Sequence, residues 1–181
     1  MKRLTPRQIT FIRAQPIFFV ATAACEGRVN VSPKGMDSLR VLDPRRVVWL
    51  NLTGSGNETA AHVAASGRMT LMFMSMSASP LILRVYGKAR VVHPRHTEWN
   101  ELVRLFPPMA GSRQIFDLAV DATASSCGSG VPIMTVDAIR GNDELEPFYA
   151  EMSDEQLHDY WSRKNVTSID GLATGILEDC V

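Results

Sequence analysis

The sequence predicts a mostly β protein, a largely antiparallel barrel with a few helices. Many short β-rich stretches are joined by turn residues, and few segments have a helical pattern. The clearest strand covers residues 81–92, where apolar residues alternate with charged and polar ones. A chain of 181 residues can bury one full core but hardly two. We therefore expect residues 1–181 to form one domain, with a C-terminal helix and tail from about residue 150.

The first half of the chain begins with a helix and continues with strands. Thr5 can cap the helix, Pro6 suits its first turn, and Gln8 completes a capping box. The helix should end before Pro16. Strands are then expected at residues 17–24, 29–32, 39–42, 47–52, 69–75 and 81–92. Pro33 should end the second of these strands.

The remaining elements follow from capping signals and apolar runs. Asn57 is a good N-cap and Gly67 a good stop for a short helix between them. Ser153 and Gln156 predict a second capping box at the start of an amphipathic helix. Helices are expected at residues 58–66, 97–106 and 153–164, and strands at residues 114–122 and 133–139.

Composition argues against several classes of protein. No apolar run approaches the roughly 18–20 residues of a membrane span, and the basic N-terminus lacks the apolar stretch of a signal peptide. Three cysteines form no C-x-x-C pair and leave one unpaired: Cys25, Cys127 and Cys180. A reduced, cytoplasmic setting is therefore expected. No metal site is expected at His93 and His96, because Pro94 breaks helical geometry between them.

Charge is distributed unevenly along the chain. Through Thr97 there are 14 basic and 4 acidic residues, whereas from Glu98 onward there are 5 basic and 15 acidic ones. Such asymmetry can indicate a nucleic-acid surface. Here the basic residues are spread among apolar strands, which favours a small anionic ligand instead. Mutual neutralisation of the two halves, within one chain or across a dimer, is the alternative.

A glycine-rich loop, Gly54-Ser55-Gly56, lies between a predicted strand and a predicted helix. Backbone amides of such a loop and of the helix start can bind a phosphate. Candidate ligands are Ser55, Asn57 and Thr59, with Lys34 and Arg84 as neutralising cations. Glu58 in the first helical turn would compete with a phosphate. Alternatively, the two glycines merely turn a strand into a helix.

Three known motifs fail at this loop. A Walker A loop needs Gly-Lys-Ser/Thr where Asn57-Glu58-Thr59 stands. A dinucleotide-binding fingerprint needs a third glycine and an acidic residue about 20 positions later, but residues 59–97 contain no acid. A nucleophile elbow needs G-x-S-x-G. The loop is therefore assigned to none of these.

Several motifs stand in a characteristic order: S-P-K-G at residues 32–35, T-G-S-G-N-E-T-A-A-H at residues 53–62, C-G-S-G-V-P at residues 127–132 and S-I-D-G at residues 168–171. With the strands between them, they resemble the pyridoxamine 5′-phosphate oxidase-like flavoproteins, in particular a bacterial and fungal branch. The resemblance covers about residues 5–172. It implies a six-stranded split barrel that forms a homodimer and binds FMN in clefts at the dimer interface.

The resemblance also implies which residues bind the cofactor. Along the flavin it places Ser32, Pro33, Lys34 and Gly35; along the ribityl chain Asn51, Leu52 and Thr53; and at the phosphate end Gly54, Ser55, Gly56, Asn57, Glu58 and Thr59, with Arg84 approaching the cleft. The pyridoxine-phosphate oxidases have Arg-Lys where this chain has Asn57-Glu58. That exchange weakens a dianion site unless another cation compensates.

The expected function is that of an FMN-dependent oxidoreductase with an unknown small-molecule substrate. Vitamin B6 oxidation is not expected, because the arginine-bearing C-terminal substrate motif of the oxidases is missing. No catalytic side chain can be assigned. One alternative is a binding protein on the same barrel that holds FMN or another anionic ligand without turnover. Another is haem binding, for which His62 is the motif-linked candidate ligand.

Overall fold

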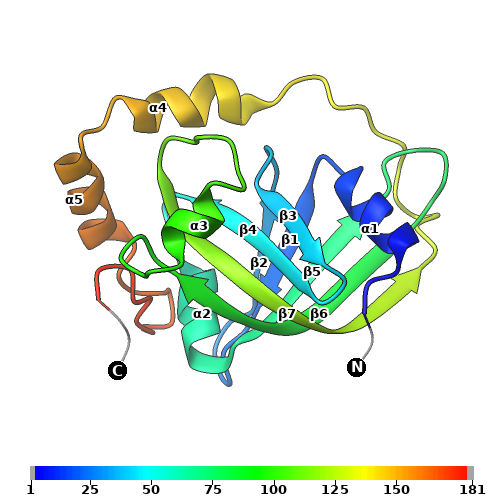
Figure 1. Ribbon diagram of the computed structural model, residues 1–181, viewed down its shortest axis with the longest axis horizontal. Coiled ribbons are helices and arrows are strands. Elements are labelled where there is room, and N and C mark those ends of the chain that lie inside the picture. Colours follow the sequence, from blue (N-terminus) through cyan, green and yellow to red (C-terminus); the bar gives the residue numbers. More distant parts are fainter. Residues whose placement is uncertain (1–2, 179–181) are drawn as a thin grey trace.

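A computed structural model describes residues 3–178 and contains one antiparallel sheet of seven strands with a few helices (Figure 1). The strand order is β2-β1-β5-β6-β7-β4-β3. The strands are β1 Phe18–Thr22, β2 Asn30–Lys34, β3 Leu39–Asp43, β4 Arg46–Leu52, β5 Arg68–Met74, β6 Ile82–Val92 and β7 Ser112–Ser126. The predicted mostly antiparallel β fold is confirmed, but with seven strands instead of six.

The two edge strands of the sheet, β2 and β3, are consecutive in the chain. Only residues 35–38 connect them, and so short a link spans at most about 18 Å. The edges of a flat seven-stranded sheet would lie about 29 Å apart. The sheet therefore has to curl until its edges approach each other, although no pairing between β2 and β3 closes it within residues 3–178. The result is a barrel that is open along one seam.

The inside of the curled sheet holds the main core. Trp49 of β4 and Phe116 of β7 are fully buried and stack with ring centroids 4.5 Å apart. Phe18 of β1 meets the edge of the Trp49 ring. On β6 the predicted alternation is confirmed, because Leu83 and Val85 are buried while their neighbours are more exposed.

Three predicted helices form at their capping signals. Helix α1 (Pro6–Arg13) and helix α5 (Asp154–Lys164) each begin with a complete capping box. Helix α2 (Glu58–Ser66) ends at Gly67, whose φ of 65° is the left-handed conformation that glycine adopts easily. None of the helices in residues 3–178 combines the length and apolar character needed to cross a bilayer.

Two strand predictions are wrong. Pro33 does not end β2, which continues to Lys34. Proline is tolerated there because β2 is an edge strand with β1 as its one neighbour. Residues 133–139 form no strand, and Met134 donates one backbone hydrogen bond to Met76 instead of joining a ladder. This segment belongs to the long connection after β7 that passes over the sheet to α4 (Figure 1).

Two helical regions also differ from expectation. The helix expected at residues 97–106 is limited to α3 (Trp99–Val103), one short stretch flanked by turns. The chain after the long connection forms a π-helix, η1 (Gly141–Leu145), and a helix, α4 (Glu146–Ala150), neither of which is among the helices expected from the sequence. Pro147 in the first turn of α4 is a helix-start signal that was overlooked.

Candidate functional site

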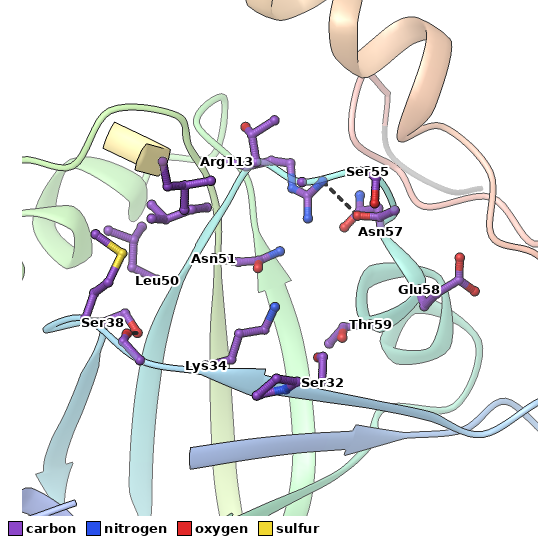
Figure 2. Close-up of a pocket in the computed structure, with 18 of the residues that line it drawn as sticks. Ser32, Lys34, Ser38, Leu50, Asn51, Ser55, Asn57, Glu58, Thr59 and Arg113 are labelled. Atoms are coloured by element: carbon purple, nitrogen blue, oxygen red, sulfur yellow. Dashed lines mark hydrogen bonds between the residues drawn. The ribbon is translucent and has the colours of Figure 1, made fainter. Parts of the chain in front are cut away.

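A cavity of about 450 Å³ lies at the open seam of the barrel (Figure 2). Its walls are β2 on one side and the end of β4 with the following loop and the start of α2 on the other. Thirteen of the fourteen predicted cofactor residues line it: Ser32, Pro33, Lys34, Gly35, Asn51, Leu52, Thr53, Gly54, Ser55, Gly56, Asn57, Glu58 and Thr59. The volume lies within the ~300–1,000 Å³ typical of small-molecule and cofactor sites.

The glycine-rich loop leaves β4 along a fixed path. Both the backbone N–H and the hydroxyl of Thr53 donate to the carbonyl of Gly111, at 2.7 and 2.8 Å. The indole N–H of Trp161 on α5 donates to the Thr53 hydroxyl at 2.9 Å. A Cβ added to Gly54 would meet no atom within 4 Å. The loop is therefore anchored at its start and open toward the cavity.

The start of α2 leaves backbone amides available. Asn57 occupies the N-cap position, as predicted, but its side chain makes no capping hydrogen bond. It donates instead to the carbonyl of Asn165 at 3.3 Å. The first backbone N–H groups of a helix carry partial positive charge, and here none of them donates a hydrogen bond to a capping side chain. This end of the cavity suits an anion.

Lys34 projects from β2 into the cavity toward Asn51 and Arg113 (Figure 2). Its ammonium lies 5.6 Å from the centroid of the Trp49 ring. Burial, and secondarily the positive charge of Arg113, lowers the pKa of Lys34 to about 8. Lys34 is thus a cation at neutral pH that forms no ion pair with a carboxylate of residues 3–178, and an anionic ligand would stabilise its charge.

Arg113, in β7, is the cavity residue that the sequence reasoning missed. It is 3% exposed, and its guanidinium donates to the carbonyl of Gly56 at 3.1 Å and to Oδ1 of Asn165 at 2.8 Å. Burial lowers the pKa of Arg113 to about 10, so it stays charged at neutral pH. Its Nε is buried without a hydrogen-bond partner. No carboxylate of residues 3–178 forms an ion pair with it.

One sequence signal could have revealed Arg113. An arginine and a glutamine, Arg113-Gln114, stand near the start of β7, directly before the apolar pair Ile115 and Phe116. Both polar residues are buried, and Gln114 accepts a hydrogen bond from Asn51 at 3.3 Å. Arginine is almost never buried without a partner for its charge, because burying an unpaired charge is costly. An arginine in a buried strand therefore indicates a binding site or an ion pair.

Glu58 lines the cavity rim, but its carboxylate points away from the interior (Figure 2). Both carboxylate oxygens accept the backbone N–H of Ile169, at 3.0 and 3.1 Å. The expected competition between this carboxylate and an anion at the loop is reduced, because the side chain is held elsewhere. Glu58 does not close the cavity.

Two other candidates lie outside the cavity. Arg84 sits on β6, where it pairs in register with Met72 of β5 and Ala124 of β7 and donates to the hydroxyl of Ser126 at 3.3 Å. It is half-buried and does not reach the cavity of its own chain. His62 is buried within α2, with Nδ1 3.1 Å from the Thr22 hydroxyl, and does not line the cavity either.

A second, larger cavity of about 650 Å³ adjoins the first. The two share Pro33, Lys34, Gly35, Met36 and Leu145 as lining residues. The remaining residues of the second cavity are mostly apolar, apart from Arg140 and Glu144, and come from the segment before β1, from Met76, and from the long connection, η1 and α4. The second cavity therefore lies beside the part of the first cavity that Lys34 lines.

Comparisons with protein-family models and with known proteins agree on one family. The family model described as pyridoxamine 5′-phosphate oxidase matches residues 4–127, which is more than half of the chain. The pyridoxamine 5′-phosphate oxidase family protein ustO of Aspergillus flavus is 33% identical over 175 residues, covering 87% of this chain and 70% of that protein.

Solved structures share the fold at low sequence identity. A candidate pyridoxamine 5′-phosphate oxidase from Lactobacillus delbrueckii superposes with a TM-score of 0.54 and 23% identity, covering 68% of this chain and 99% of that chain. HupZ of Group A Streptococcus superposes with a TM-score of 0.51 and 19% identity, covering 66% and 91%. At this identity the likeness shows a common fold.

Proposed function

This chain belongs to the pyridoxamine 5′-phosphate oxidase family, and on that premise we propose that it is a flavoprotein that holds FMN in the 450 Å³ cavity. The observation that carries the proposal is Arg113, a buried cation beside a glycine-rich loop with no carboxylate partner in residues 3–178. A buried charge is costly unless it is paired. A ligand phosphate would pair with it.

The phosphate end of FMN fits the loop between β4 and α2. The open face of Gly54 and the uncapped amides of α2 can accept an anion. The unpartnered Nε of Arg113 is a further donor at the same end. This arginine compensates for Asn57-Glu58, which replace the Arg-Lys pair of the oxidases.

The rest of the cavity suits the ribityl chain and the flavin ring. Asn51 and Thr53 offer polar groups between the loop and Lys34. Lys34 supplies a positive charge beside the aromatic face of Trp49. Bound FMN would supply the redox chemistry, while the protein binds the cofactor, orients it and sets the charge around it. The adjoining apolar cavity offers a route for a small-molecule substrate, which supports an FMN-dependent oxidoreductase.

We also propose that the protein works as a homodimer. The outer face of the central strands carries half-buried apolar side chains, among them Phe19, Met72, Met74 and Ile82. Apolar residues gathered on an outer face favour an interface. Arg84 lies on the same face, so it would approach a cofactor cleft only from a partner chain.

We further propose that the protein works in the cytoplasm, because the exposed cysteines Cys25 and Cys127 are free thiols and a reducing compartment keeps thiols in this state. Cys180 lies outside the described residues.

A second candidate function is FMN binding without turnover. The residues that line the 450 Å³ cavity include no histidine, cysteine, tyrosine or aspartate, and the carboxylate of Glu58 is held by Ile169. The cavity therefore offers few side chains for proton transfer. Anaerobic mixing of the FMN-loaded protein with NADPH or NADH separates the two candidates, because bleaching of the flavin absorbance is expected only for the oxidoreductase.

The binding proposal is tested by titrating the purified protein with FMN and with riboflavin, which lacks the phosphate. FMN should bind much more tightly than riboflavin. Arg113→Gln should lower FMN affinity by about 10- to 100-fold, the range expected when a charge-assisted hydrogen bond is lost, and leave riboflavin affinity nearly unchanged. The same substitution at the exposed Arg104 is the matched control. A wild-type protein that binds neither flavin would refute the proposal.

A further inference from the structure

The segment that follows α5 contacts the glycine-rich loop, although more than a hundred residues separate them in the chain. Its centre is Asn165, which is completely buried. The side-chain amide of Asn165 donates to the carbonyl of Gly54 at 2.9 Å, and its Oδ1 accepts the guanidinium of Arg113 at 2.8 Å. The backbone carbonyl of Asn165 accepts the side chains of Asn57 and Thr174. One residue thus joins both ends of the loop to Arg113.

The chemistry of these bonds leaves the Arg113 charge uncompensated. Its two hydrogen-bond acceptors in residues 3–178 are the Gly56 carbonyl and the Asn165 amide, and both are neutral. A carboxylate at either place would form a buried ion pair and cancel the charge. A neutral amide fixes the direction of the guanidinium and preserves its charge for a ligand.

The same C-terminal segment also forms hydrogen bonds and an ion pair with the elements on both sides of the cavity. Ile169 donates to Glu58 at the start of α2. Asp170 accepts the backbone N–H of Arg28 at 2.7 Å and forms an ion pair with the Arg28 side chain, which ties the segment to the turn before β2. The family model ends at residue 127, so the C-terminal partner in each of these contacts lies outside the region that it matches.

We propose that Asn165 is a positioning residue for the phosphate end of the site, and that the selectivity of this protein for a phosphorylated flavin depends on it. The inference rests on the proposed binding of FMN. Asn165 acts through Arg113 and the carbonyl of Gly54, not by touching the ligand. Its neutral side chain is the property that matters.

The test is Asn165→Asp, which keeps size, shape and the acceptor oxygen, removes the N–H that donates to the Gly54 carbonyl, and adds a negative charge beside Arg113. FMN affinity should fall by about 10- to 100-fold, as for loss of one charge-assisted interaction, while riboflavin affinity should change less than about twofold. The same substitution at the exposed Asn100 of α3 is the matched control. General loss of structure would weaken both ligands equally. An unchanged ratio of FMN to riboflavin affinity in Asn165→Asp would overturn the inference.

A double substitution isolates the charge effect. In the Arg113→Gln background, Asn165→Asp should lower FMN affinity far less, because no cation remains to be neutralised and the loss that remains reports the missing bond to Gly54. An equal loss in both backgrounds would contradict action through Arg113. If Asn165→Asp does not fold, Asn165→Ala provides the test, with a smaller but still FMN-selective loss expected. Wild-type protein that binds no FMN would refute the proposed function itself, an outcome distinct from either result with the variants.

Discussion

The carboxylate of Glu58 accepts the backbone N–H of Ile169 through both of its oxygens, at 3.0 and 3.1 Å. This contact turns an acidic side chain at a helix start away from the cavity that the same helix start faces (Figure 2). A residue that would oppose anion binding thereby becomes part of the contact between α2 and the C-terminal segment.

Glu58→Gln should therefore strengthen FMN binding modestly. The glutamine oxygen can still accept the N–H of Ile169, while a negative charge near the loop is removed. We expect a gain of about two- to fivefold in affinity, since partly exposed charges interact weakly. Fluorescence titration measures it, with the exposed Glu151→Gln as control. A loss of affinity would show that the contact with Ile169 needs the full charge.

Lys34 should make FMN affinity depend on pH. Its pKa of about 8 means that the ammonium loses its proton as the pH rises through this value. Affinity should then fall by about three- to tenfold between pH 7 and 9.5, as expected for loss of one favourable charge interaction. Lys34→Met should bind more weakly at pH 7 and show a flatter profile. Parallel titrations of both proteins across this range give the comparison, and identical slopes would exclude Lys34 as the titrating group.

The same lowered pKa has the opposite effect on the stability of the protein without ligand. Below pH 8 Lys34 is protonated in the folded and the unfolded chain, and its burial is unfavourable. Between about 8 and the ordinary value of 10.5 the unfolded chain holds more protons, so the contribution of Lys34 to folding stability rises with pH. Denaturant midpoints measured at pH 7.5 and pH 10 should rise more, or fall less, for the wild type than for Lys34→Met. A constant difference between the two proteins would contradict this prediction.

Gly87→Ala should destabilise the barrel. Gly87 lies in β6 beside a register shift, and an added Cβ would clash with the carbonyl oxygen of Ala119 in β7. Forcing these two central strands apart should cost about 1–3 kcal/mol of unfolding free energy or more. Gly130→Ala, where a Cβ meets nothing within 4 Å, is the control in thermal or denaturant unfolding. Equal midpoints for the two variants would contradict the close approach of β6 and β7.

The sequence predicted the parts of the site that depend on local signals. Asn57 and Gly67 mark the ends of α2 correctly because helix limits are set by a few adjacent residues. Lys34 and the glycine-rich loop, both predicted to contact the cofactor, line the same cavity. Their meeting depends on the short link between β2 and β3, which forces the sheet to curl.

Contacts between distant parts of the chain could not be read from the sequence. The polar character of Arg113 is visible, but its place beside Gly56 depends on the pairing of β7 with β4. The role of Asn165 depends on the docking of the segment after α5. Residues 133–139 have the β-branched composition of a strand, yet they find no adjacent sheet edge to pair with.

The bonds from Asn165 to Gly54 and Arg113 also set an order of events during protein synthesis. At about 5–20 residues per second, a ribosome adds residue 165 roughly 3–10 s after residue 113. During this interval the nascent chain carries the glycine-rich loop and the arginine but not the amide that joins them. Under the roles proposed for Arg113 and Asn165, tight FMN binding would follow translation of the C-terminal segment and come after the early folding of the strands.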